Sequence, residues 1–153
     1  MIIALALLIG VVAGLRAMTA PAAVSWGAWL GWLPVADSWA SFMGHWLAVT
    51  LFTLAALAEL VTDQLPSTPS RKVPPQFGAR IVSGALSGAV IGTAGGMLVA
   101  GLVAGIIGAV IGTLGGAEAR RRLAEAFGRD LPAALLEDAV AILGALWIVS
   151  AVA

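Results

Sequence analysis

Long apolar stretches, separated by short polar segments, dominate the sequence. A helix that crosses the hydrocarbon core of a bilayer needs about 20 predominantly apolar residues. Five stretches are candidates, covering residues 2–15 and running on to 19, 39–60, 77–94, 98–114 and 132–152. Gly95 and Gly96 separate the third stretch from the fourth. The pattern predicts an all-α, polytopic membrane helical bundle, with about five transmembrane helices in a single integral membrane domain over residues 1–153.

Two further segments have helical character but are too short to cross a membrane. Residues 21–33 begin with Pro21, which suits the first turn of a helix, and carry Trp26, Trp29 and Trp32 at helical spacing. Tryptophan favours the headgroup boundary, so we expect a short interfacial or re-entrant helix here. Residues 117–127 are rich in charge and end at Gly128. We expect this second short helix to lie at the polar surface.

The composition supports the membrane class. Hydrophobic residues make up 61% of the chain and charged residues only 10%, whereas soluble domains carry roughly a quarter charged residues. The high hydrophobic and low charged content excludes a soluble domain and intrinsic disorder. The first stretch lacks a basic n-region, and Pro21 stands where cleavage would leave a new N-terminus. We therefore expect this stretch to be a membrane helix rather than a cleaved signal peptide.

Residue counts exclude several kinds of chemistry. The absence of cysteine excludes a disulfide framework, a cysteine-ligated metal site and a thiol nucleophile. A single histidine, His45, excludes a histidine-based metal site. The serines have no triad context, and the glycine runs lack the lysine of a phosphate-binding loop. We expect no metal, no cofactor and no enzymatic activity, and the net charge of +0 favours no nucleic-acid partner.

The basic residues predict an orientation. If the helices at 77–94 and 98–114 form a hairpin, seven of the eight lysines and arginines lie on one side: Arg71, Lys72, Arg80, Arg120, Arg121, Arg122 and Arg129. Basic residues near the ends of spans mark the cytoplasmic side. With five spans, the N-terminus is then inside and the C-terminus outside.

An internal repeat is a second expectation. Residues 9–15 resemble residues 107–113, and each segment precedes a break and a short helix. Units 2–66 and 98–153 would then form an inverted repeat about the connector helix 77–95, as in many transporters. The alternative is a chance similarity between small apolar residues.

Glycines recur four residues apart on two of the predicted spans. They are Gly84, Gly88, Gly92 and Gly96 on one span, and two sets on the other, Gly101 with Gly105 and then Gly108, Gly112 and Gly116. Small residues on one face allow two helix backbones to approach closely. The glycine faces therefore predict either packing of these two helices within one chain or a seam between copies in a homo-oligomer.

Acidic residues lie about one turn inside the predicted cytoplasmic ends of two spans. Glu59 and Asp63 are four residues apart and share a helix face, while Glu137 and Asp138 lie at the same membrane level, where Arg80 opens another span. An acidic cluster there is a candidate site for a cation or a proton, or an anchor for a cationic substrate. The alternative is a structural set of ion pairs with Arg80, Arg120 or Arg121. Glu59 is the deepest acid and the strongest candidate.

Arg16 and His45 are the candidates for an outer opening. Arg16 lies near the predicted outer end of the first span, where it could bind an anion or a lipid phosphate, or simply the free carbonyls of that helix end. His45 lies near the outer end of the second span and could meet Arg16. A lone histidine there is more often a structural hydrogen-bonding group than a ligand.

Three pieces of the chain carry a family resemblance. They are Gly14-Leu15-Arg16-Ala17 followed by Pro21, the run Glu59-Leu60-Val61-Thr62-Asp63-Gln64-Leu65-Pro66, and the run Arg80-Ile81-Val82-Ser83-Gly84-Ala85-Leu86. The sequence resembles the domain of unknown function 4126 family of small bacterial membrane proteins, with Gln64 where the family pattern often has lysine. The resemblance implies a location in the bacterial inner membrane and a polar core of Arg16, Glu59, Asp63, Pro66 and Arg80. It implies no activity.

These observations favour a small transporter- or channel-like membrane protein for an ion or small solute, in which Glu59 and Asp63 attract a cation or proton. One alternative is a structural or partner-binding membrane protein that assembles through its glycine faces, with membrane lipids as further partners. A weaker alternative is a lipid-handling membrane protein.

Overall fold

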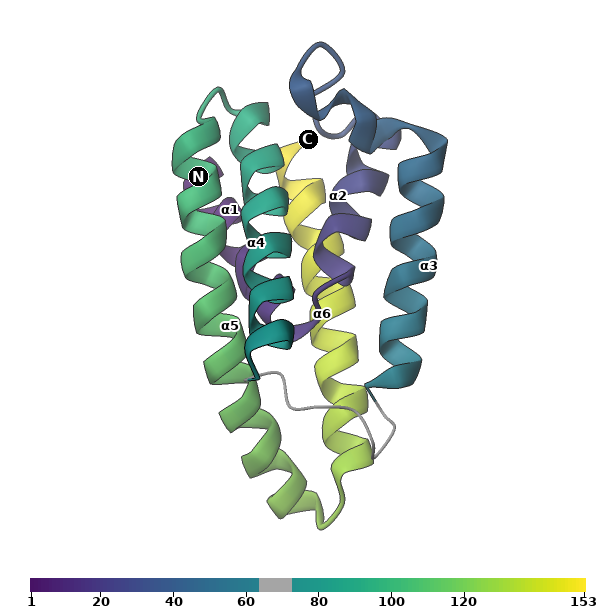
Figure 1. The fold of residues 1–153 in the computed structure, drawn as a ribbon, viewed down its shortest axis with the longest axis vertical. Helices are drawn as coiled ribbons and strands as arrows, with labels where there is room; N and C mark the ends of the chain where they lie inside the picture. The colour runs from purple at the N-terminus through teal and green to yellow at the C-terminus, as the bar shows by residue number, and fades with distance from the viewer. Residues whose placement is uncertain (64–72) are drawn as a thin grey trace.

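The computed structural model describes residues 1–63 and 73–153, and every regular element in these ranges is helical. The elements are α1 (Ile2–Leu15), α2 (Thr19–Trp29), the 3₁₀ helix η1 (Trp39–Gly44), α3 (Trp46–Thr62), α4 (Pro74–Ala94), α5 (Leu98–Phe127) and α6 (Asp130–Val152), shown in Figure 1. The all-helical prediction is confirmed. Among the described residues three helices, α4, α5 and α6, are long and apolar enough to cross a membrane, while α1 and α3 are shorter apolar helices. The count of five spans is not confirmed.

The first apolar stretch does not cross the bundle as one helix. Helix α1 has 14 residues, a length of about 21 Å at 1.5 Å per residue, which is shorter than a hydrocarbon core of about 30 Å. Arg16 then takes an extended conformation, with φ −141° and ψ 111°, and the chain turns back into α2. Most of α2 is buried, so it packs within the bundle rather than on its surface. We call residues 16–18, where the direction reverses, the hairpin tip.

This reversal brings both termini to the same end of the molecule (Figure 1). A side chain at Gly95, in the turn between α4 and α5, would touch Ile2, so the N-terminus lies beside that turn. Helix α6 ends at Val152 at the same end. The prediction of termini on opposite faces is not supported, because α1 enters the bundle and α2 returns to the end from which α1 began.

Cysteine labelling checks this arrangement, and the native chain contains no cysteine to interfere. We expect a cysteine appended before Met1 and a second one at Ala153→Cys to react with a membrane-impermeant maleimide from the same side of the membrane. Ala126→Cys is exposed near the opposite end of α5, and it should react only from the other side. Labelling of the two termini from different sides would contradict the hairpin.

Two other boundaries differ from the prediction. Residues 117–127 are not a separate helix, because α5 runs through Gly115 and Gly116 and ends only at Gly128, which has a left-handed φ of 72°. The predicted span 39–60 is also divided. Its first residues form η1, and α3 begins at Trp46 after an extended His45, whose Nδ1 accepts the Leu47 N–H at 3.2 Å.

The glycine faces pack within the chain. Helices α4 and α5 run antiparallel, and a Cβ added to Gly88 would lie 2.7 Å from the Cα of Gly105, closer than real side chains come. On the adjoining face of α5, a Cβ added to Gly108 would lie 2.8 Å from the amide nitrogen of Val11 in α1. Gly84, Gly92, Gly101 and Gly112 make similarly close approaches. Both seams are therefore occupied by helices of the same chain.

The same contacts contradict the inverted repeat. The segments 9–15 and 107–113 lie side by side, since Gly10 approaches Gly105 and Gly14 approaches Thr113. Helices α1 and α5 therefore run in the same direction, whereas inverted units must run in opposite directions. Their sequence similarity reflects one shared requirement, which is small residues where two backbones meet.

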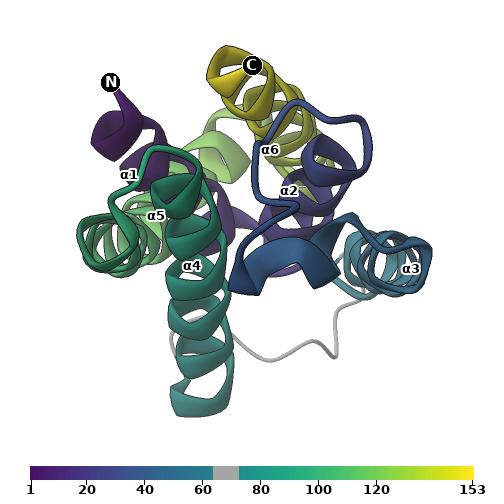
Figure 2. The ribbon, with the colours of Figure 1, turned by 90° about the horizontal axis from the view of Figure 1, so that it is seen from above.

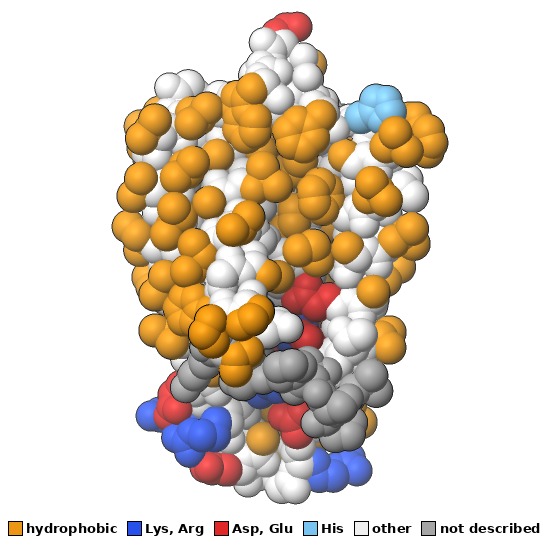
Figure 3. Space-filling view, in the orientation of Figure 1, with side chains coloured by type: hydrophobic (Ala, Val, Ile, Leu, Met, Phe, Trp, Pro, Cys, Tyr) orange, Lys and Arg blue, Asp and Glu red, His pale blue; other side chains and the backbone are white. Residues whose placement is uncertain are grey.

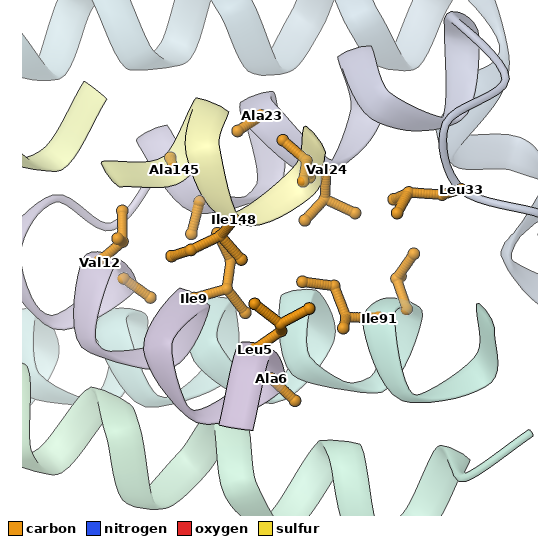
Figure 4. Packing of buried hydrophobic residues seen from close by; sticks show 14 of the residues in the cluster. Leu5, Ala6, Ile9, Val12, Ala23, Val24, Leu33, Ile91, Ala145 and Ile148 are labelled. Carbon is orange, nitrogen blue, oxygen red and sulfur yellow. The ribbon is translucent and has the colours of Figure 1, made fainter. Parts of the chain in front are cut away.

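Four helices enclose the apolar core. Figure 4 shows Leu5, Ile9 and Val12 of α1 meeting Val24 of α2, together with Ile91 of α4 and Ile148 of α6. Seen from above, α3 lies at the edge of the bundle and packs mainly against α2 and η1 (Figure 2). At the end that holds the termini, Leu33, Val35 and Met43 of the segment 30–45 are buried in the same core. This end of the molecule is thus closed by apolar packing.

Candidate functional site

Seven charged side chains gather around the hairpin tip. This charge cluster contains Arg16, Glu59, Asp63, Arg80, Arg120, Glu137 and Asp138, contributed by the hairpin and by α3, α4, α5 and α6. Acidic side chains are visible at mid-height between apolar surfaces in Figure 3, whereas basic side chains gather at the lower end. The acids and Arg80 that the sequence grouped together do lie together, and Arg16 joins them.

Arg16 is the centre of the charge cluster, and its side chain is 0% exposed. Its Nε donates to Asp138 Oδ1 at 2.6 Å, and its Nη1 donates to Asp63 Oδ2 at 3.0 Å. The same Nη1 lies 3.6 Å from Glu137 Oε2. A guanidinium offers several donors in a fixed plane, so it can bind several carboxylates at once. Arg16 thereby joins α3 to α6 through the tip.

Glu59 binds the start of α2 rather than an open space. Its Oε1 accepts the N–H of Ala17 at 2.7 Å, and its Oε2 accepts the N–H of Met18 at 2.6 Å. The first amides of a helix have no partner within the helix, and their partial positive charge favours a carboxylate. Arg80 Nη2 lies 4.0 Å from Glu59 Oε1. Glu59 therefore acts as a cap supplied by α3, and it fixes the position of the hairpin tip.

Two side chains of α4 donate hydrogen bonds to backbone carbonyls at the end of α1 and in the hairpin tip. Arg80 Nη1 donates to the carbonyl of Gly14 at 2.9 Å, and its Nη2 lies 3.8 Å from Asp63 Oδ2. Ser83, one turn further along α4, donates its hydroxyl to the carbonyl of Ala17. Ser83 is not among the site residues predicted from the sequence. Its position three residues after Arg80, on the same helix face, is the signal that could have identified it.

A chain of ion pairs leads from the tip to the lower end of the molecule. Glu137 lies between Arg16 and Arg120, with its Oε2 3.4 Å from Arg120 Nη1. Arg120 Nη2 in turn pairs with Asp130 Oδ2 at 2.7 Å, and the Asp130 side chain is 62% exposed. In the other direction, beyond the tip, Val12 and Val24 are buried in the apolar core. Charged side chains of the described residues therefore connect the charge cluster to one end only.

The predicted outer opening of Arg16 and His45 is not formed. Arg16 contacts Asp63 just after the end of α3, whereas His45 caps the beginning of α3, so the two residues lie at opposite ends of that helix. The prediction was wrong because α1 stops halfway and carries Arg16 to the acids. Gln64, Pro66, Arg71 and Lys72 lie outside the described residues.

The remaining arginines of α5 belong to the surface. Arg121 pairs with Glu118 and Glu125, and Arg122 pairs with Glu118, all on exposed side chains. Exposed pairs of this kind contribute little to stability. Within residues 1–63 and 73–153, no group of three histidine, aspartate or glutamate side chains is arranged to hold a metal ion.

Comparison with known proteins identifies no similar protein. The family resemblance stays a prediction. No protein-family model matches the chain, and no curated protein or solved structure shows a significant match to it.

Proposed function

We propose that the protein is a small transporter- or channel-like membrane protein that carries an ion or a small solute through the charge cluster. The observation that supports this proposal is Arg16, a fully buried arginine held between Asp63 and Asp138 at the hairpin tip. Each charged residue at the centre of a span costs about 2.5–3.5 kcal/mol on insertion scales, and such residues typically mark ion or substrate pathways. Interrupted helices at mid-membrane are likewise typical of transporters.

The distribution of charge supports an orientation. Arg120, Arg121, Arg122 and Arg129 belong to the lower end of α5 and the turn into α6, and basic residues mark the cytoplasmic side. The ion pairs of Glu137, Arg120 and Asp130 then connect the charge cluster to the cytoplasmic side. Both termini face the opposite compartment, where Leu33, Val35 and Met43 close the bundle. This arrangement corresponds to an inward-facing state.

Flux measurements in proteoliposomes test the proposal. We expect the purified protein to carry protons, sodium or potassium down an imposed gradient, read with a pH-sensitive or ion-sensitive dye inside the vesicles. Asp63→Asn and Asp138→Asn keep the shape of each side chain but remove the charge that faces Arg16, so each should lower the flux at least tenfold. Glu118→Gln, at an exposed pair outside the cluster, is the matched control and should keep the wild-type rate.

Two results would contradict the proposal. One is the absence of flux for all three ions and for a panel of small solutes with folded wild-type protein. The other is a wild-type rate in both aspartate variants. Glu59→Gln is less informative in this assay, because Glu59 also caps α2 and its loss affects the hairpin directly.

A further inference from the structure

Two hollows on the surface between α2 and α3 form one continuous groove. The hollow nearer to the end that holds the termini has a volume of about 350 Å³ and the other about 160 Å³, and Trp26 and Thr53 line both. The lining residues of α3 recur at helical spacing from Trp46 to Leu60, and those of α2 recur in the same way from Thr19 to Trp29. Each helix therefore contributes one face to what we call the α2–α3 groove.

The α2–α3 groove exists because α3 lies at the edge of the bundle. Helix α3 buries only three of its side chains, and Figure 2 shows α2 between α6 and α3. Leu54 and Leu57 line the groove on α3, and they are 58% and 55% exposed. The groove is thus open on the outer surface of the bundle, where a chain with membrane-spanning helices meets the hydrocarbon of the bilayer.

Hydrogen-bond donors gather at the end of the groove nearest to the termini. The indole N–H groups of Trp29 and Trp46 have no hydrogen-bond partner in the part of the chain that the structure describes. His45 adds a third donor beside them, since its ring lies 5.9 Å from that of Trp46. Its Nδ1 accepts the Leu47 N–H, so the proton of the neutral ring is on Nε2.

We infer that the α2–α3 groove binds one phospholipid, with an acyl chain along the groove and the phosphate and ester oxygens at Trp29, Trp46 and His45. Tryptophan is enriched where headgroups meet hydrocarbon, which sets the level of the lipid. The rise from Trp46 to Leu60 is about 21 Å at 1.5 Å per residue. One leaflet holds about 15 Å of hydrocarbon, half of a core of about 30 Å, so an acyl chain that starts at Trp46 fits within the groove.

The distribution of polar groups favours a phospholipid over other ligands. No charged side chain of the described residues lines the groove, so an inorganic ion has no counter-charge there. A plain hydrocarbon would fill the groove but leave the N–H groups of Trp29 and Trp46 without an acceptor, which is unfavourable away from water. A phospholipid has both the acceptor oxygens and the chain. This inference goes beyond the proposed function and does not depend on transport.

Native mass spectrometry of the full chain in detergent tests the inference, with palmitoyl-oleoyl phosphatidylcholine as the probe. We expect one phospholipid to bind per chain, at least tenfold more tightly than the diacylglycerol with the same acyl chains, which lacks the phosphate. Thr50→Trp places a large side chain in the groove and should weaken binding at least tenfold. Leu51→Trp adds the same side chain at a position that is 64% exposed and outside the groove, and it should bind like the wild type.

A second set of variants tests the donors. Trp29→Phe combined with Trp46→Phe keeps the aromatic rings but removes both N–H groups, so it should weaken binding of phosphatidylcholine at least fivefold. His45→Asn retains a residue that caps α3 well while removing the Nε2 donor, and it should weaken binding in the same direction. Trp147→Phe, at an exposed tryptophan of α6 outside the groove, is the control and should have no effect.

Several outcomes would overturn the inference. They are the absence of bound phospholipid on folded wild-type protein, equal affinity for the diacylglycerol, equal effects of Thr50→Trp and Leu51→Trp, or a dimer of the chain in place of the lipid adduct. Ion flux measured on the same preparations tests the proposed function separately. Flux without a bound phospholipid overturns only the lipid assignment, whereas a bound phospholipid without any flux overturns only the transport proposal.

Discussion

Replacement of Arg16 by methionine should lower the free energy of unfolding by about 3–5 kcal/mol, the cost of breaking a buried ion pair by removing one partner. Arg16 donates to both Asp63 and Asp138 and is fully buried. Methionine fills much of the same volume but leaves these carboxylates without that guanidinium. The loss should appear as a shift of the unfolding midpoint in mixed micelles of sodium dodecyl sulfate and a mild detergent, followed by far-ultraviolet circular dichroism.

A control variant and a second-site rescue distinguish the loss of the buried ion pair from the loss of an arginine in general. Arg122→Met removes an exposed arginine paired with Glu118 and should cost less than about 1 kcal/mol. Adding Asp138→Asn to Arg16→Met removes one of the carboxylates that Arg16 binds and should restore part of the lost stability. Equal effects of Arg16→Met and Arg122→Met would show that Arg16 is not the electrostatic centre of the bundle.

Gly105→Leu should have a comparable or larger effect, because Gly105 lies where two seams meet. A Cβ there would lie 3.0 Å from the Cα of Gly88 and closer still to the backbone of Gly84, and Gly10 of α1 approaches Gly105 from the other side. These atoms all belong to the backbone, so no side-chain rotation relieves the clash. Overpacking in a core typically costs about 1–3 kcal/mol. We expect Gly105→Ala to fall in that range and Gly105→Leu to prevent the native helix packing.

Glycines with open surroundings provide the control for this series. Gly144→Ala replaces a helical glycine at which a Cβ meets nothing within 4 Å, so it should leave stability unchanged or raise it by up to about 1 kcal/mol through helix propensity. The same micelle titration measures both positions. A wild-type midpoint for Gly105→Leu would mean that α4 and α5 do not pack as closely as described.

The sequence predicts the local elements well because their causes are local. Apolar runs and the Gly95-Gly96 break define α4 and the beginning of α5, and glycines four residues apart indicate a close helix contact. The grouping of Glu59 and Asp63 with Glu137 follows from their distance to the helix ends. Each of these inferences needs only one segment and its immediate neighbours.

The path of the chain could not be predicted in the same way. The sequence indicates a break after residue 15, but it does not show that the chain reverses its direction there. The partners of Arg16, which include Asp63 and Asp138, come from α3 and α6, and no local pattern shows that they surround one arginine. The same is true of α5, where the pair Gly115-Gly116 resembles a helix end but stays inside a continuous helix.

The cap that Glu59 places on α2 has a consequence for the order in which the protein matures. The amides of Ala17 and Met18 depend on a carboxylate that the ribosome adds 42 and 41 residues later. Arg16 depends on Asp138, which follows it by 122 residues. The first two helices to be synthesised therefore cannot complete their contacts until α3 and α6 have been made, and a nascent chain released before α6 would hold Arg16 without Asp138.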